Sequence, residues 1–256
     1  MRDSSPGFIR QTSSGAFTID WRRIAPESYL ATDRLLREIV KRRELAFGNM
    51  LDIGCGTKPY EAVFAPYVRR HVGIDMPFSP HEQTRIDIYG SATQLPFSDA
   101  SFDFVLCTEV LEHLPEPQQC LTEIGRVLRP GGIALVTSPF MYRIHEAPYD
   151  FFRYTPFSYK YMAEKAGLHV EDIAGRGGLL TVCYDMLFKV QAAIFGALNQ
   201  LIRRFVRTRK HLLQTSPVRA MFALPQFVLA RLLRYESIKS DVYTLGYVVT
   251  LRKASI

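Results

Sequence analysis

Residues 49–56 read Asn-Met-Leu-Asp-Ile-Gly-Cys-Gly, a short apolar run that ends in a glycine-rich turn. An apolar run closed by glycines is typical of a buried parallel strand. In an open α/β sheet, ligands bind at the carboxyl ends of the strands, and glycines there let the backbone approach a nucleotide. The dinucleotide fingerprint Gly-x-Gly-x-x-Gly would need a glycine at position 59, where Pro59 stands. The turn therefore indicates a nucleotide-like ligand and disfavours a dinucleotide.

The same kind of strand recurs along the chain and alternates with helical stretches. Apolar spacing predicts helices over about 26–45, 117–128 and 156–166. Besides 49–53, strands are predicted over 71–75, 84–88, 102–108, 132–138, 169–174 and 243–252. Strands separated by helices imply a sheet covered on both faces. We therefore expect an α/β fold with a doubly wound, mostly parallel, seven-stranded Rossmann-like sheet and a helical insertion before the last strand.

Composition limits the class of protein and its compartment. The chain has 256 residues, of which 47% are apolar and 22% charged, which supports a large core and excludes a disordered or fibrous protein. We expect a mobile amino-terminal arm without regular structure over 1–25 and a single domain over 26–256. No secretory signal and no long uncharged apolar run is found, so a cytoplasmic protein is expected. The four cysteines form no Cys-x-x-Cys pair, and we expect reduced thiols and no metal.

Two carboxylates flank the glycine turn. Asp52 stands two residues before Gly54, where it could meet an ammonium group that no dinucleotide has. This pattern suits an adenosyl amino acid. Asp75 ends the next predicted strand, nineteen residues after Gly56, and an acidic side chain in that place can accept hydrogen bonds from both ribose hydroxyls.

Three further stretches carry a family resemblance. They read LPFSDASFDFV at 95–105, EVLEH at 109–113 and RVLRPGG at 126–132. Together with the turn at 52–56, and in this order over about residues 48–175, they resemble the class I S-adenosylmethionine-dependent methyltransferases, in their type 11 small-molecule branch. The resemblance implies S-adenosyl-L-methionine as the cofactor and methyl transfer as the reaction.

The resemblance also implies which residues bind the cofactor. Ser91 stands where the family commonly has an aspartate, a departure at the contact to the adenine amino group. The implied set comprises Asp52, Gly54, Cys55 and Gly56 at the methionine end, Asp75 at the ribose, Met76 on the adenine, Ala92 at the adenine edge, Thr108 facing the methyl donor, and Lys58 with Tyr60 covering the cofactor.

A polar segment after the predicted strand 132–138 is expected to face the acceptor. Its pattern HxxPxDFFRYT, together with GTKPY at 56–60, resembles a subgroup associated with surface glycan or natural-product pathways. His145 and Asp150 of this segment, at the carboxyl edge of the sheet, could bind or deprotonate a hydroxyl group. His113 in EVLEH is a further candidate base, although a histidine at the start of a loop is more often structural.

The net charge of +7 comes from one segment. Between Met186 and Tyr235 there are nine Lys or Arg and no Asp or Glu, so the rest of the chain sums to 7 − 9 = −2. Large apolar residues are interleaved at helical spacing. The segment belongs to a helical basic insertion over about 178–240, for which two interpretations are compatible: a cap over the acceptor site, or a surface that contacts anionic lipid.

These observations lead to one function and two rivals. We expect methylation of an oxygen on a small-molecule, glycan or lipid-linked acceptor, by a cytoplasmic enzyme with peripheral contact to the inner membrane surface through 186–235. An RNA methyltransferase is disfavoured, because the basic segment carries long aliphatic residues and no separate nucleic-acid module is found. A catalytically inactive scaffold is the second rival, and turnover distinguishes it from an enzyme.

Overall fold

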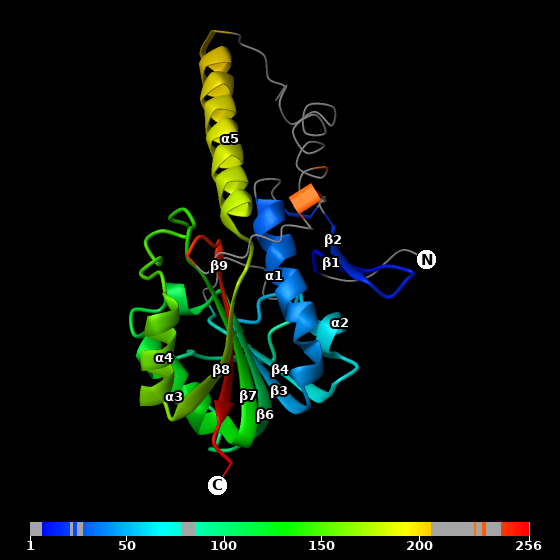
Figure 1. The fold of residues 1–256 in the computed structure, drawn as a ribbon, viewed down its shortest axis with the longest axis vertical. Helices are drawn as coiled ribbons and strands as arrows, with labels where there is room; N and C mark the ends of the chain where they lie inside the picture. The colour runs from blue at the N-terminus through cyan, green and yellow to red at the C-terminus, as the bar shows by residue number, and fades with distance from the viewer. Residues whose placement is uncertain are drawn as a thin grey trace.

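The protein contains one seven-stranded sheet, seen edge-on between helices in the computed structural model of the chain (Figure 1). The structure describes residues 7–20, 23–24, 28–77, 85–205, 228, 232–233 and 242–255. The strand order is β5-β4-β3-β6-β7-β9-β8, and only β9 runs antiparallel to its neighbours. The strands are β3 (Gly48–Ile53), β4 (Val68–Asp75), β5 (Ile88–Tyr89), β6 (Phe102–Thr108), β7 (Leu128–Pro139), β8 (Leu168–Gly175) and β9 (Gly246–Lys253). The predicted fold class is confirmed.

The two central strands β3 and β6 are apolar because they are buried on both faces. Side chains alternate between the faces along each strand. Leu51 and Val105 pack into a core on one side, whereas Met50 and Phe104 pack into a core on the other. The glycine turn at the end of β3 is thus attached to the most buried part of the sheet.

Helices supply the second layer on each face. α1 (Tyr29–Lys41) and the short α2 (Glu61–Phe64) cover one face, where Leu35, Ile39 and Phe64 join the core. α3 (Pro117–Val127) and α4 (Pro156–Lys165) cover the other, through Leu121 and Tyr159. Two single-turn helices, η2 (Arg43–Leu45) and η3 (Leu111–His113), complete the connections. The parallel strands of this doubly wound sheet all end at one edge, from which the functional side chains project.

The amino-terminal segment is structured, contrary to our prediction. Within it, β1 (Ile9–Gln11) and β2 (Phe17–Ile19) form an antiparallel hairpin. Ile9 and Ile19 are paired and buried against the core beneath α1. Because each strand has only three residues and lies in a segment rich in Ser, Thr and Gly, the sequence shows no periodic signal that could reveal them.

The predicted helical insertion begins with one long helix. α5 (Leu179–Phe205) starts after β8, at the edge where the parallel strands end, and extends away from the sheet (Figure 1). Its first turns are anchored, because Val182 packs against Ala31 and Leu245. Farther along, Leu187, Val190 and Ile194 are more than half exposed. Most of the chain between 206 and 241 lies outside the described residues.

Across the described parts of the chain, none of the helices combines the length and apolar character needed to cross a membrane.

Candidate active site

The turn after β3 has a conformation that requires its glycines. Gly54 and Gly56 have φ angles of 67° and 48°, in the left-handed region that side chains rarely adopt. A Cβ atom on Gly54 would lie 2.3 Å from Val110, whereas one on Gly56 would meet no atom within 4 Å. Gly56 therefore borders open space, and the backbone there is accessible to a ligand.

Asp75 closes this turn from the end of β4. Its two carboxylate oxygens accept hydrogen bonds from the backbone N–H groups of Gly56, at 2.8 Å, and Met76, at 2.7 Å. A carboxylate has about four acceptor positions. Asp75 can therefore hold the turn and still accept hydrogen bonds from two ribose hydroxyls. The remaining acceptor positions of Asp75 suit a nucleoside, and nucleoside binding at this turn stays a prediction.

Asp52 is held beneath the turn by a residue that sequence reasoning did not single out. Its carboxylate is buried and lies 3.0 Å from Nε2 of His71 on β4. Burial raises the pKa of Asp52, and the hydrogen bond to His71 opposes this shift. Asp52 and His71 thus form a pair inside the fold that joins β3 to β4.

We expected Lys58 to cover the cofactor, but its side chain points into the protein. Its side chain is buried, and Nζ lies 2.5 Å from Oδ2 of Asp87 and 3.4 Å from the carbonyl oxygen of His71. The same Asp87 oxygen accepts a 2.7 Å hydrogen bond from the Gly73 N–H. Lys58 therefore ties the turn to β4, and its ammonium group does not extend over the ligand space. Tyr60, expected beside it, is likewise buried.

The remaining cofactor candidates lie at the ends of four neighbouring strands, β5, β4, β3 and β6. Met76 follows β4 and is 51% exposed, so its side chain is available to cover an aromatic ring. Ala92 is buried in the short turn after β5, where Ser91 bonds to Thr93 at 2.8 Å. Thr108 ends β6 and pairs in register with Thr137 of β7. Cys55, within the turn itself, is a buried free thiol.

An internal ion pair joins the ends of β6, β7 and β8. Glu109, with a φ of 54°, accepts hydrogen bonds from the Thr137 hydroxyl at 2.8 Å and from Arg176 at 2.6 Å. Arg176 follows β8 and is buried. Neither Glu109 nor Arg176 was predicted as functional, because they are 67 residues apart and only the strand order brings them together.

Glu112 is a buried acidic residue of the site without a hydrogen-bond partner for its side chain among the described residues. Its side chain is fully buried in η3, and neither carboxylate oxygen accepts a hydrogen bond of normal geometry within the described part of the chain. Burial, followed by the charge of Glu109, raises the pKa of Glu112 well above its ordinary value. Buried polar groups are nearly always paired, so an unpaired carboxylate calls for an explanation.

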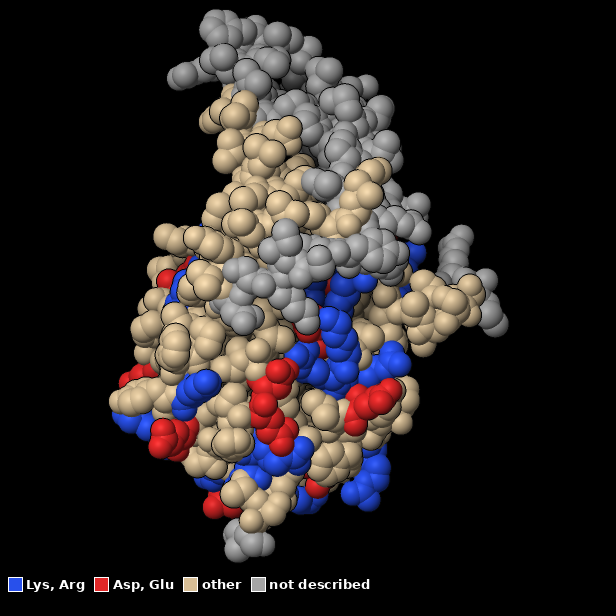
Figure 2. Space-filling model, in the orientation of Figure 1, with Lys and Arg blue, Asp and Glu red and all other residues tan. Residues whose placement is uncertain are grey.

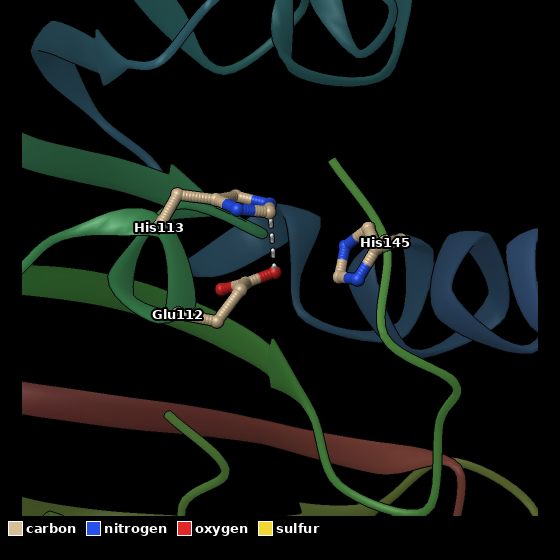
Figure 3. A group of neighbouring side chains, drawn as sticks. All are labelled: Glu112, His113 and His145. Atoms are coloured by element: carbon tan, nitrogen blue, oxygen red, sulfur yellow. Dashed lines mark ion pairs between the residues drawn. The ribbon is translucent and has the colours of Figure 1, made fainter. Parts of the chain in front are cut away.

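His113 and His145 face each other beside Glu112, as Figure 3 shows. Their ring centroids are 4.8 Å apart. His113 Nδ1 lies 2.6 Å from the carbonyl oxygen of Tyr149, which can only accept, so this nitrogen carries a proton. His113 Nε2 lies 3.7 Å from Glu112 and 3.8 Å from Glu146. The structure thus places two of the predicted catalytic residues ring to ring, and the third, Asp150, contacts His145.

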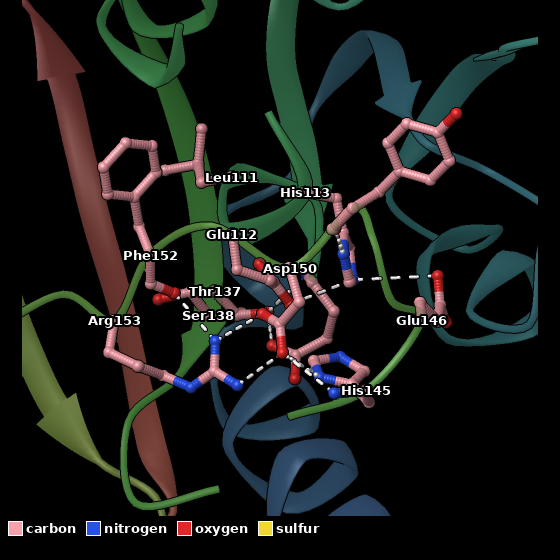
Figure 4. A network of polar contacts seen from close by, with 12 residues as sticks. Leu111, Glu112, His113, Thr137, Ser138, His145, Glu146, Asp150, Phe152 and Arg153 are labelled. Carbon is pink, nitrogen blue, oxygen red and sulfur yellow. Dashed lines mark hydrogen bonds and ion pairs between the residues drawn. The ribbon is translucent and has the colours of Figure 1, made fainter. Parts of the chain in front are cut away.

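Asp150, the third predicted catalytic residue, organises the loop that carries His145 (Figure 4). It accepts hydrogen bonds from the His145 backbone at 2.8 Å and from Arg153 at 2.6 and 2.8 Å, and it lies 3.2 Å from His145 Nδ1. The Arg153 hydrogen bonds hold the pKa of Asp150 well below its ordinary value. This geometry favours a positioning residue over a base. Burial lowers the pKa of His145, which keeps its imidazole neutral near pH 7.

Comparison with known proteins shows a likeness to methyltransferases. Residues 51–136 match the methyltransferase domain family. A Mycolicibacterium smegmatis protein named "probable S-adenosylmethionine-dependent methyltransferase" is 35% identical over 50% of this chain and 54% of its own length. An O-methyltransferase of Aspergillus nomiae is 33% identical over 44% of this chain and 56% of its own length. The chain thus spans about half the length of the curated relatives it matches.

A solved structure confirms the fold without fixing the chemistry. The [4+2]-cyclase SpnF has a TM-score of 0.53 and 20% identity, and the likeness covers 89% of this chain and 83% of SpnF. Residues 51–136 thus resemble a methyltransferase domain, and the Mycolicibacterium smegmatis relative is named for its dependence on S-adenosylmethionine. The family match ends at residue 136, before the segment that contains His145 and Asp150.

Proposed function

We propose that this protein transfers a methyl group from S-adenosylmethionine to a hydroxyl oxygen of a small-molecule acceptor. The observation that carries the proposal is the placement of two kinds of site along one edge of the sheet. The open turn at Gly56, closed by Asp75, suits the nucleoside. The histidine pair His113 and His145, beyond β6 and β7, suits a hydroxyl group. The likeness to an O-methyltransferase supports oxygen as the accepting atom.

Alignment of the reactants accounts for most of the catalysis that we propose. When bound, S-adenosylmethionine supplies a methyl group on a positively charged sulfur, which leaves as a neutral thioether. The protein has to place the acceptor oxygen in line with that methyl group and exclude water. In this scheme the turn with Asp75 fixes the nucleoside, and the rigid strand ends of β6 and β7 fix the groups that face the acceptor.

The histidine pair can accept the proton that the acceptor hydroxyl group loses. With Nδ1 of His145 directed at the Asp150 carboxylate, which only accepts, the lone pair of Nε2 stays available. A histidine whose imidazole is neutral at working pH can bind a hydroxyl group and accept its proton as the oxygen attacks. Asp150 fixes the ring orientation, as the orienting carboxylate does in other histidine-based sites.

We propose more specifically that the acceptor is a glycan or is linked to a lipid. Its support is the position of α5, which rises from the same edge of the sheet with an exposed apolar face. The resemblance of 145–155 to the HxxPxDFFRYT segment of a subgroup points the same way. We propose that the insertion covers the acceptor and contacts the anionic surface in which such an acceptor resides.

An acceptor screen with methyl-labelled cofactor tests the proposal. We expect label to appear in a hydroxylated acceptor as a methyl ether, together with one equivalent of S-adenosylhomocysteine. His145→Ala and Asp150→Asn should lower turnover and leave the affinity for S-adenosylhomocysteine within about twofold of wild type. His169→Ala, at an exposed histidine on β8, is the matched control. Tight cofactor binding without label transfer to any acceptor would instead indicate a scaffold protein.

A further inference from the structure

Three potential metal ligands converge at the edge of the sheet, next to the acceptor space. One ligand atom each from Glu112, His113 and His145 lies within 4.8 Å of the others. In Figure 3 the Glu112 carboxylate points at the His113 ring, and the His145 ring lies on the other side of the same space. Glu112 and His113 come from η3, and His145 comes from the loop after β7. Two separate segments therefore build one cluster.

The unpaired carboxylate of Glu112 indicates that this cluster lacks a cation. Glu112 is completely buried, and its oxygens accept no hydrogen bond of normal geometry from the described residues. A buried carboxylate without partners is costly, and such groups are normally paired or coordinate a metal. His113 Nε2, at 3.7 Å, is too distant for a hydrogen bond to Glu112. A cation between the two groups would satisfy both.

The second nitrogen of each histidine is arranged as in metal sites. His113 Nδ1 donates to the Tyr149 carbonyl oxygen at 2.6 Å, and His145 Nδ1 lies 3.2 Å from the Asp150 carboxylate. Histidines that bind metals almost always donate their other ring N–H to a carbonyl or a carboxylate, which fixes the tautomer. Both Nε2 lone pairs are therefore free. That of His113 faces the carboxylates of Glu112 and Glu146, which is an unfavourable arrangement until a cation lies between them.

We infer that Glu112, His113 and His145 bind one divalent first-row transition-metal ion, of the class to which Zn²⁺ and Co²⁺ belong. Two imidazoles and one carboxylate suit these ions better than Mg²⁺ or Ca²⁺, which prefer oxygen ligands. Ligand atoms about 2.1 Å from one ion lie roughly 3.0–3.4 Å apart, so the cluster would contract by little more than about 1 Å. Our sequence-based expectation of no metal considered only cysteine spacing, which says nothing of a Glu and two His from separate loops.

Three protein ligands leave coordination positions open, and this gives the ion a role at the acceptor. That role rests on the proposed function. A metal with open positions can bind an acceptor hydroxyl oxygen and lower its pKa, so that the hydroxyl releases its proton to water near neutral pH and the oxygen then attacks the methyl group. The two histidines would then act through the ion and not as direct bases. The acceptors most favoured are those with two adjacent oxygens, because these can occupy two open positions at once.

Metal uptake by the full chain tests the inference. We use Cys183→Ser protein as the background, because Cys183 is an exposed thiol that could bind zinc. After treatment with a chelator, the protein is dialysed against Zn²⁺, and bound metal is measured by mass spectrometry. We expect one equivalent per chain. His113→Ala and His145→Ala should each weaken the affinity at least about tenfold, and His169→Ala should leave it unchanged.

A second measurement does not depend on folded variants. Co²⁺ added to the metal-free protein should broaden the ring signals of His113 and His145 in NMR spectra and leave that of His169 sharp. The inference is overturned if the protein takes up no Zn²⁺ or Co²⁺, or if the His113 and His145 variants bind it as the background protein does. Cofactor binding and methyl transfer are measured on the same samples. Transfer by metal-free protein would refute the ion's role at the acceptor and leave the proposed function intact, whereas bound metal without transfer to any acceptor would refute the proposed function and leave the metal site intact.

Discussion

At the scale of single residues, Asp75 combines a structural and a binding function in one carboxylate. Replacing it with Ala removes two hydrogen bonds that hold the turn and two that we assign to the ribose. Hydrogen bonds to a charged group contribute about 1.5–3 kcal/mol each. We therefore expect the affinity of Asp75→Ala for S-adenosylhomocysteine to fall about tenfold or more, as measured by calorimetry. Asp172→Ala, at an exposed residue paired with Arg42, is the control, and wild-type affinity in Asp75→Ala would refute the ribose assignment.

Arg176 is the only cation within hydrogen-bond distance of Glu109 in the described structure, and its side chain is buried. Arg176→Met would leave two neighbouring carboxylates, those of Glu109 and Glu112, without this charge. Removing one partner of a fully buried ion pair costs about 3–5 kcal/mol. Because the Glu109 side chain is 32% exposed and can be hydrated, we expect a smaller loss of about 1–3 kcal/mol in the free energy of unfolding, measured by urea denaturation.

The double variant Glu109→Gln/Arg176→Met should lose less stability than the sum of the two single variants. The reason is that the second change removes the charge that the first leaves unpaired. Additive losses would mean that the two groups do not act as a pair.

At the scale of elements, Arg126 explains why the motifs at 95–105 and 126–132 occur together. From the end of α3 it donates to the carbonyl oxygens of Leu95 and Phe97 and to Glu123, and Glu123 accepts a 2.7 Å hydrogen bond from the Leu95 N–H. The loop before β6 is thereby fastened to the helix that follows β6. Two sequence motifs thus describe one structural unit.

Arg126→Gln should reduce the free energy of unfolding by about 1–3 kcal/mol at pH 7. The hydrogen bond from Arg126 is the largest cause that lowers the pKa of Glu123 below its ordinary 4.5. Because the folded pKa is the lower one, this pairing stabilises the protein above pH 4.5, and the stabilisation is lost as the pH falls through the folded value. The gap between wild type and variant should therefore shrink in acid.

Urea denaturation from pH 7 into the acid range measures the difference in free energy of unfolding between wild type and Arg126→Gln. Hydrogen exchange at the Leu95 amide shows whether the destabilisation lies in the loop before β6. The matched variant Arg129→Gln breaks a similar pair with Asp103 and should leave exchange at Leu95 unchanged. A gap that is constant with pH would show that Glu123 plays no part in it.

At the scale of the whole molecule, the sequence predicted features that depend on neighbouring residues. It missed contacts between residues that are distant in the sequence and that only the fold brings together. The strand, turn and Asp75 are readable because glycines and apolar runs leave a short-range pattern. Arg176 and His71 meet their partners, and Glu112 is buried, only when the strands assemble in the order β4-β3-β6-β7-β9-β8. Lys58 was misjudged for the same reason, since its partner Asp87 lies 29 residues away in the turn before β5.

The outer part of the insertion gives the last prediction, contact with an anionic membrane surface. On α5, Leu180, Leu187, Val190 and Ile194 are spaced seven, three and four residues apart, which places them on one helix face, and all four are exposed. Nine basic residues and no acid lie between 186 and 235, although Lys189 is already engaged by Asp185 and by the Tyr142 ring. Such an apolar face with basic residues is suited to a lipid interface.

We expect the protein to sediment with anionic vesicles at low salt and to be released in part at high salt, with little binding to neutral vesicles. Each basic residue near the surface contributes about 1 kcal/mol, which salt screens, and apolar insertion supplies a salt-resistant remainder. Changing Arg203, Arg204, Arg207 and Arg209 together to Gln should abolish binding, and Leu187→Asn/Ile194→Asn should remove the salt-resistant part. The charge-matched control changes four exposed residues elsewhere, Arg69, Arg70, Lys160 and Lys165, to Gln and should bind as wild type does. If the protein stays in solution with anionic vesicles at low salt, the insertion is only a cap, and a soluble acceptor replaces the lipid-linked one, because no surface then brings the site to a bilayer.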